Sequence, residues 1–150
     1  MLKDALLNKG WGGRTITRQE TLERLNVILR PFHEMTYTYD VAIERLSNAE
    51  SRERLKSFQR TTRADGGKLA ESVLSSGGVP ESGVDMELRD FDPGNDDASI
   101  IAHLIDLENA LLDRVAEERK VSHRMHTRAV LGAVEKNAKE RLDYLKSIRK

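Results

Sequence analysis

The chain has 150 residues, no cysteine, 25 basic and 25 acidic side chains, and 5% aromatic residues. The lack of cysteine excludes disulfides, thiolate metal sites and cysteine nucleophiles, and agrees with our expectation of a cytoplasmic protein. Because the charges balance, we expect neither nucleic acid nor an anionic membrane as a partner. A domain of this length buries a substantial core without covalent staples, and its low aromatic content favours helices over a β-sandwich or barrel.

The start of the chain, MLKDALLNKGWGG, has no long apolar stretch and no small-residue cleavage site, so we do not interpret it as a signal peptide. No apolar run approaches the roughly 20 residues that span a bilayer, so no membrane segment is predicted. We interpret residues 1–16 as an N-terminal extension and residues 17–150 as one helical bundle. Trp11 is expected to pack on that bundle or on a neighbouring subunit.

Residues 18–47 are predicted to form the first helix. Thr17 and Glu20 have the spacing of a capping box, in which each side chain accepts a hydrogen bond from a backbone N–H at the helix start. Pro31 lies inside the helix, where we expect a kink rather than an end, because the apolar stripe continues in phase across it. Steps of three and four residues trace this stripe: Leu22, Leu25, Ile28, Phe32, Met35, Tyr39, Ala42 and Leu46.

A break at residues 47–51, with Asn48 as its turn residue, separates the first helix from a second at residues 52–75. Asp65 falls in the apolar stripe of this second helix. Gly66 and Gly67 cost up to about 1 kcal/mol each relative to alanine, which predicts either close packing or a bend. The other inward positions of this helix are Leu55, Phe58, Thr62, Leu69 and Val73.

Residues 77–97 are rich in Gly, Pro, Asp and Asn and show no sustained period. Fully extended, about 20 residues cover roughly 65 Å, whereas a helix of about 24 residues is roughly 36 Å long. The segment can therefore travel the whole length of a bundle, which a tight hairpin would not require. This length predicts a long crossover between the second and third helices, as in ferritin-like bundles.

The third and fourth helices are predicted at residues 97–119 and 123–148, with Asp96 or Asp97 as the first N-cap. No glycine or proline lies between Ala98 and Leu131. We place the turn at residues 120–123 because apolar density falls there and Ser122 can cap a new helix. Their stripes are Ile101, Leu104, Glu108, Leu111 and Val115, and then Val130, Leu131, Val134, Ala138, Leu142, Leu145 and Ile148.

These features predict an all-α, antiparallel four-helix bundle. The layout resembles the ferritin-like superfamily, and more narrowly the bacterial DUF2383 family of unknown function. The resemblance covers about residues 20–148 and implies a fold more readily than an activity. It rests on the Tyr-Asp-x-Ala run at 39–42, Leu55-x-x-Phe58, Leu-Ala-Glu at 69–71 before Gly-Gly-Val-Pro at 77–80, and a second helical pair containing Glu108.

Three carboxylates, Asp65, Glu108 and Glu135, are predicted to share one depth near the middle of the bundle. Di-iron members of the superfamily combine inward carboxylates with Glu-x-x-His on two helices. Here the residues three positions on are Lys68, Leu111 and Ala138. Three carboxylates without imidazoles make a poor di-iron site.

The prediction is therefore a relic polar layer. Glu108 would be buried and hydrogen-bonded to Tyr39, Arg63 or a residue of the last helix, with Asp65 at the stripe edge in water. A single divalent metal bound by Glu108, Asp65 and water is an intermediate alternative. No cofactor is expected in the relic layer, although iron or another divalent metal is the cofactor to test.

Other candidate sites are weaker. His123 and His126 have i,i+3 spacing, but two ligands make a weak metal site and such histidines are usually exposed. His33 is interpreted as a polar residue on the outer face and His103 as a partly exposed flank residue. No nucleophile elbow or phosphate-binding loop is present, so no catalytic residue is proposed. The basic residues of the last helix, Arg141 among them, are explained by the helix dipole.

Two hypotheses follow. The first is a non-enzymatic structural or interaction protein, including a stress-related one, that forms a homodimer and has an unidentified protein partner. Apolar and aromatic residues outside the stripes (Trp11, Tyr37 and Ile43) motivate the dimer. The second is a ferritin-like metalloprotein that binds or oxidises iron through Asp65, Glu108 and Glu135.

Overall fold

The structure is a computed structural model that describes residues 15–87 and 90–149. Its four helices are α1 (Arg18–Arg45), α2 (Ala49–Ser75), α3 (Asp97–Glu118) and α4 (Met125–Ile148). Within these ranges no residue is in a β-strand, and no helix is long and apolar enough to cross a membrane. Trp11 and most of the predicted N-terminal extension lie outside the described residues.

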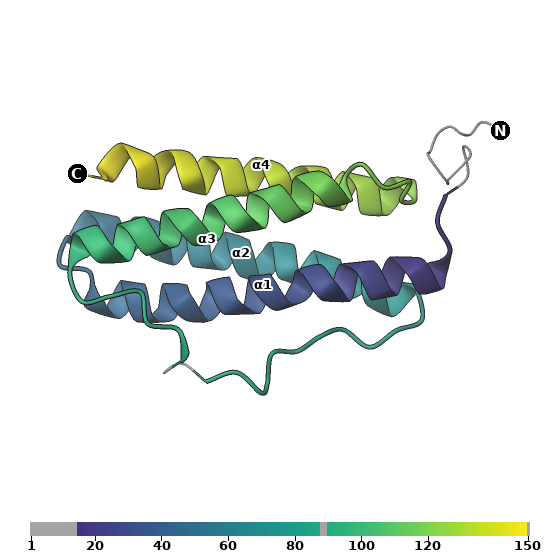
Figure 1. Ribbon diagram of the computed structural model, residues 1–150, viewed down its shortest axis with the longest axis horizontal. Helices are drawn as coiled ribbons and strands as arrows, with labels where there is room; N and C mark the ends of the chain where they lie inside the picture. The colour runs from purple at the N-terminus through teal and green to yellow at the C-terminus, as the bar shows by residue number, and fades with distance from the viewer. Residues whose placement is uncertain (1–14, 88–89, 150) are drawn as a thin grey trace.

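The helices form an antiparallel bundle of two hairpins, α1–α2 and α3–α4 (Figure 1). α1 packs against α2 and α3, and α4 packs against α3 and α2. Residues 76–87 and 90–96 run along the length of the bundle, so that α3 starts beside the end of α1 (Figure 1). This arrangement confirms the predicted ferritin-like four-helix bundle with a long crossover between the second and third helices.

Local capping sets where the helices begin. The predicted capping box is present, since the Glu20 backbone N–H donates to Thr17 Oγ1 at 3.1 Å and the Thr17 N–H donates to Glu20 Oε1 at 2.8 Å. α1 continues through Pro31 without ending. α2 begins at Ala49, earlier than predicted, because the Asn48 side chain accepts from the backbone N–H of Ser51.

The start of α3 agrees with expectation, whereas the start of α4 differs from it. Asp96 is the N-cap of α3, while both carboxylate oxygens of Asp97 accept hydrogen bonds from Ser47, at 3.0 and 2.6 Å. Ser122 does not cap α4, which starts at Met125. The Ser122 carbonyl instead accepts from the Ile16 backbone N–H at 2.9 Å, so the chain before α1 is tied to the turn before α4.

The core is made by the four predicted stripes. Of the side chains expected to face inward, Leu22 and Ile148 are partly buried and the others are buried. Gly66 does not interrupt α2, and a Cβ placed there would lie 3.7 Å from Phe32 Cβ, which is ordinary packing distance.

The crossover is attached to the outer face of α1 by polar side chains. Asn26 Nδ2 donates to the Val79 carbonyl at 3.0 Å, and the Glu81 N–H donates to Asn26 Oδ1 at 2.8 Å. Two helical turns further on, the His33 ring nitrogen Nε2 lies 2.7 Å from the Glu81 carbonyl. His33 is thus on the outer face, as predicted, and it holds the crossover there.

Tyr37 extends this attachment and is not a free surface aromatic. Its hydroxyl donates to the Gly83 carbonyl at 3.3 Å, and its ring centroid lies 5.8 Å from that of Phe91. Ile43 is partly buried against the core. Two of the three residues that motivated the dimer, Tyr37 and Ile43, therefore make their contacts within the subunit. The third, Trp11, lies outside the described residues.

Two glycines allow a direct test of this packing. Gly83 has φ +70°, and a Cβ there would lie 2.9 Å from the His33 side chain. Gly83→Ala is therefore expected to lower the free energy of unfolding by about 1–2 kcal/mol, the cost of a left-handed conformation for an L-residue. Gly67→Ala, placed in open space on α2, is expected to raise that free energy by up to about 1 kcal/mol. Urea denaturation measures both, and a Gly83→Ala variant as stable as the unmodified protein would contradict the described crossover.

Candidate functional site

Four polar side chains, one from each helix, form a buried layer in the bundle. They are Tyr39 of α1, Asp65 of α2, Glu108 of α3 and Arg141 of α4, and each is at most 1% exposed. Charged groups are buried at a large cost unless they are paired and hydrogen-bonded. The contacts inside this layer therefore decide whether it is a stable structural element or a site for an added cation.

Arg141 supplies the positive charge of the layer. Its Nε donates to Glu108 Oε2 at 2.6 Å, and the Tyr39 hydroxyl donates to the same oxygen, also at 2.6 Å. Arg141 Nη1 lies 3.8 Å from Asp65 Oδ2. The guanidinium thus faces both carboxylates. Of the expected partners of Glu108, Tyr39 and a residue of the last helix bind it, whereas Arg63 pairs with Asp40.

Asp65 is buried, not solvated at the stripe edge as expected. Asn137 of α4 donates from Nδ2 to both Asp65 carboxylate oxygens, at 3.1 and 3.2 Å, which removes the need for water. Burial raises the pKa of the Asp65 carboxyl, and the opposing effects of Asn137 and Arg141 do not cancel this rise. Burial and the Glu108 carboxylate together hold the pKa of Tyr39 well above its ordinary value.

The layer sets one guanidinium against two carboxylates, and it is not fully hydrogen-bonded. Glu108 Oε1 and Arg141 Nη1 and Nη2 are buried and have no hydrogen-bond partner among the described residues. Unpaired polar atoms in a dry interior cost free energy, so the layer is sensitive to the loss of either charge.

Arg141 is the residue that the sequence interpretation misplaced, because it was grouped with the surface cations of the last helix. Its position contains a usable signal. It follows Ala138 by three residues and Val134 by seven, which puts it in phase with the buried stripe of α4. An arginine in such a register implies a buried anion on a facing helix.

Glu135 is not brought together with Asp65 and Glu108. It forms an ion pair with Arg119, which follows the last residue of α3, and it is only partly buried. The reason is helical phase: Val134 and Ala138 occupy the core-facing positions, so Glu135 is turned toward the flank.

The donor set of the layer does not fit a divalent metal. Among residues 15–87 and 90–149, no group of three His, Cys, Asp or Glu side chains is placed to hold a metal ion. The two carboxylates that do meet share a guanidinium, which cannot lose its proton in a protein to become a ligand. A cation of the chain itself therefore already faces both carboxylates.

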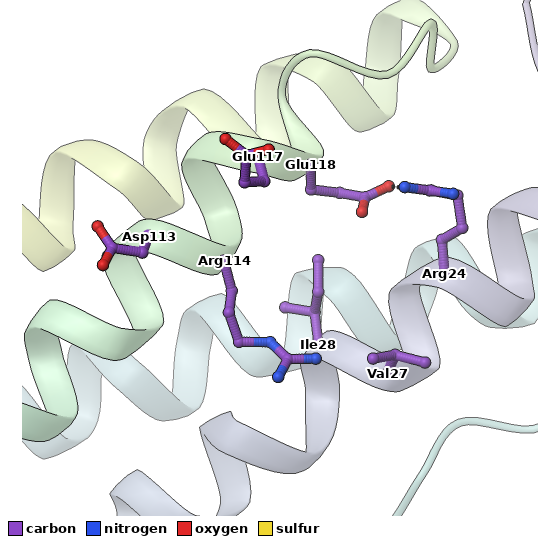
Figure 2. Close-up of a pocket in the computed structure, with 7 residues that line it drawn as sticks. All are labelled: Arg24, Val27, Ile28, Asp113, Arg114, Glu117 and Glu118. Atoms are coloured by element: carbon purple, nitrogen blue, oxygen red, sulfur yellow. Dashed lines mark hydrogen bonds and ion pairs between the residues drawn. The ribbon is translucent and has the colours of Figure 1, made fainter.

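A second polar cluster lies where α3 ends. Glu118 Oε2 accepts from Arg24 Nε of α1 at 2.7 Å and lies 2.5 Å from His123 Nε2 (Figure 2 shows Arg24 and Glu118). His123 was expected on the surface with His126. It is instead 1% exposed, while His126 is exposed, so the two do not form a pair. The turn after Glu118 folds His123 back under the carboxylate.

Burial raises the pKa of Glu118, but hydrogen bonds from His123 and Arg24 outweigh this effect and leave the pKa below its ordinary value of 4.5. The ionised carboxylate therefore stabilises the fold above that ordinary value, and the contribution is lost as pH falls through the lower folded-state pKa.

Glu118→Gln is expected to lower stability at pH 7 and to flatten its decline between about pH 5 and pH 3. Urea unfolding across this range gives the comparison. Glu117→Gln is the matched control, because the Glu117 side chain is 72% exposed and pairs only with Lys120 in the described structure. If Glu118→Gln and Glu117→Gln show the same pH dependence, the buried cluster does not stabilise the fold.

A separate test addresses the buried layer. Arg141→Met removes the cation and leaves Glu108 buried without a counter-charge, which is expected to cost about 3–5 kcal/mol. Adding Glu108→Gln should recover a large part of this loss, because the amide is neutral and still accepts from Tyr39. Glu108→Gln alone should destabilise, since it leaves Arg141 short of an anion. Strictly additive effects in urea denaturation would contradict the paired layer.

A pocket of about 430 Å³ lies beside the second cluster, between α1 and α3 (Figure 2). Ile28 is buried within it, and Val27 is 58% exposed at its edge. We call this feature the α1–α3 groove. Its lining residues are Arg24, Val27, Ile28, Asp113, Arg114, Glu117 and Glu118.

Comparison with known proteins finds solved structures with a similar fold. No family model and no curated protein match the chain. Fourteen chains of solved structures do. One is the bacterioferritin-related protein from Bacteroides fragilis, a dodecameric thioferritin. It superposes with a TM-score of 0.77 over 89% of this chain and 86% of that chain, at 14% sequence identity. The fold is ferritin-like. At 14% sequence identity, this structural similarity shows the fold alone.

Proposed function

We propose that this chain is a non-catalytic ferritin-like bundle that serves as a structural or interaction protein. The observation that carries the proposal is the position of Arg141, 2.6 Å from Glu108 and 3.8 Å from Asp65. A divalent cation entering this layer would meet a fixed positive charge in a medium of low dielectric constant, where repulsion is strong. In this proposal the chain has the ferritin-like architecture, and an internal ion pair occupies its polar layer.

Self-association, with a homodimer as the unit, is part of the proposal. The similar protein from Bacteroides fragilis is dodecameric. Three large apolar side chains on the described helices are also exposed on the single subunit: Val27, Leu74 and Met125. The cytoplasm as its location and membership of DUF2383 stay predictions that rest on the cysteine-free composition and on the short motifs of the sequence.

The second candidate is a ferritin-like protein that binds or oxidises iron. The observation in its favour is that Asp65 and Glu108 are both buried in one layer, with Glu108 Oε1 free of hydrogen bonds among the described residues. In this case iron would have to displace Arg141 from both carboxylates. Glu135, the third predicted ligand, would have to leave its ion pair with Arg119.

Elemental analysis of protein purified without chelator separates the two functions. We expect clearly substoichiometric metal and no uptake when ferrous iron is added under anaerobic conditions. One or more equivalents of iron, lost in the Glu108→Gln variant, would overturn the non-catalytic proposal. Light scattering between about 10 and 200 μM should show a dimer, and a monomer at the upper concentration would remove the self-association.

A further inference from the structure

The charges of the α1–α3 groove are incompletely paired. Arg24 and Glu118 bind each other, and Glu117 pairs with Lys120. Arg114 and Asp113, which are adjacent and exposed on α3, make no ion pair within the described part of the chain. The groove lining thus includes, on successive residues of α3, one cation and one anion without an ion pair, and their side chains point in different directions (Figure 2).

Apolar surface lies beside these charges. Val27 of α1 is 58% exposed, whereas Ile28 next to it is buried in the groove. Pro31 has no N–H to donate to the Val27 carbonyl, so this carbonyl lacks its usual helical partner. Figure 2 shows Arg114 extending from α3 toward α1 on this side of the bundle.

The crossover leaves this region accessible. It is attached to α1 through Asn26, His33 and Tyr37, which share one face of the helix. Arg24 and Ile28 lie on a different face, turned toward α3. In Figure 1 the crossover follows the edge of α1 that lies away from α3.

We propose that two copies of this chain associate groove to groove across a two-fold axis between α1 and α3. The inference rests on the self-association proposed above and names its surface. In a two-fold interface each contact occurs twice, so Arg114 of one copy meets Asp113 of the other and the reverse. The two Val27 side chains pack near the axis.

A second copy suits the groove better than a small anionic ligand. The lining holds two arginines against three acidic residues, so it has no excess of positive charge to hold an anion. Cation and anion side by side on one helix are instead complementary to the same pair presented in the opposite direction. A specific dimer buries about 800 Å² per partner, so the flanking surfaces of α1 and α3 must contribute as well.

Charge reversal gives a decisive test. Arg114→Glu places two acidic groups against each other at both symmetric contacts, and Asp113→Arg places two basic groups there. Each variant is expected to weaken the dimer at least tenfold by light scattering or analytical ultracentrifugation, because like charges in contact are strongly unfavourable. An equimolar mixture of the two variants restores opposite charges at both contacts and should form a heterodimer. Mass spectrometry under native conditions distinguishes that heterodimer by mass.

Arg60→Glu is the matched control. Arg60 is exposed on α2, which does not pack against α3, and it makes no ion pair among the described residues. Its reversal should leave the dimer unchanged. Circular dichroism checks that every variant is folded, and Val27→Glu provides a second variant that should also dissociate the dimer.

The outcomes separate the two proposals. A wild-type monomer at 200 μM overturns both the proposed self-association and its surface. A wild-type dimer that persists in Arg114→Glu, Asp113→Arg and Val27→Glu overturns the surface alone. Variants that dissociate but fail to recover on mixing also overturn it, because the contact is then not reciprocal.

Discussion

The ion pair between Arg141 and Glu108 is the interaction on which the rest of the bundle depends. It links α4 to α3, and its extensions to Tyr39 and Asp65 reach α1 and α2. Because all these groups are buried, removing one charge leaves the other unpaired in a medium that solvates it poorly. The layer therefore favours one axial alignment of the four helices, because sliding one helix along its neighbours would separate the buried charges.

The crossover has a comparable effect on topology. Its attachment along α1 brings the start of α3 to the end of α1, where Ser47 binds Asp97. α3 consequently runs antiparallel to α1, and the two helices become neighbours. This pairing brings Arg24 and Glu118 into contact, although they are 94 residues apart in the chain. It therefore forms both the Glu118 cluster and the groove beside it.

A shared fold does not by itself imply shared chemistry. Its architecture matches that of a bacterioferritin-related protein at 14% sequence identity, and four stripes with proper caps are enough to specify such a bundle. Metal binding needs more, since several oxygen or nitrogen donors must converge on one point. Here one guanidinium faces both buried carboxylates, and the third predicted ligand, Glu135, is held by Arg119 on the flank.

By itself, the sequence determined the helices, their inward faces and the long crossover, because helical period and capping are local properties. It also predicted Tyr39, Arg63 or the last helix as partners of Glu108, of which Tyr39 and the last helix supply them. Tertiary structure alone decided that Arg141 and His123 are buried, since their anions, Glu108 and Glu118, lie on another helix or across a turn. The phase of Arg141 within its stripe was visible, but arginine is rarely buried without a partner, and partners are set by packing. The Ser122 carbonyl likewise binds Ile16, a contact that no local pattern contains.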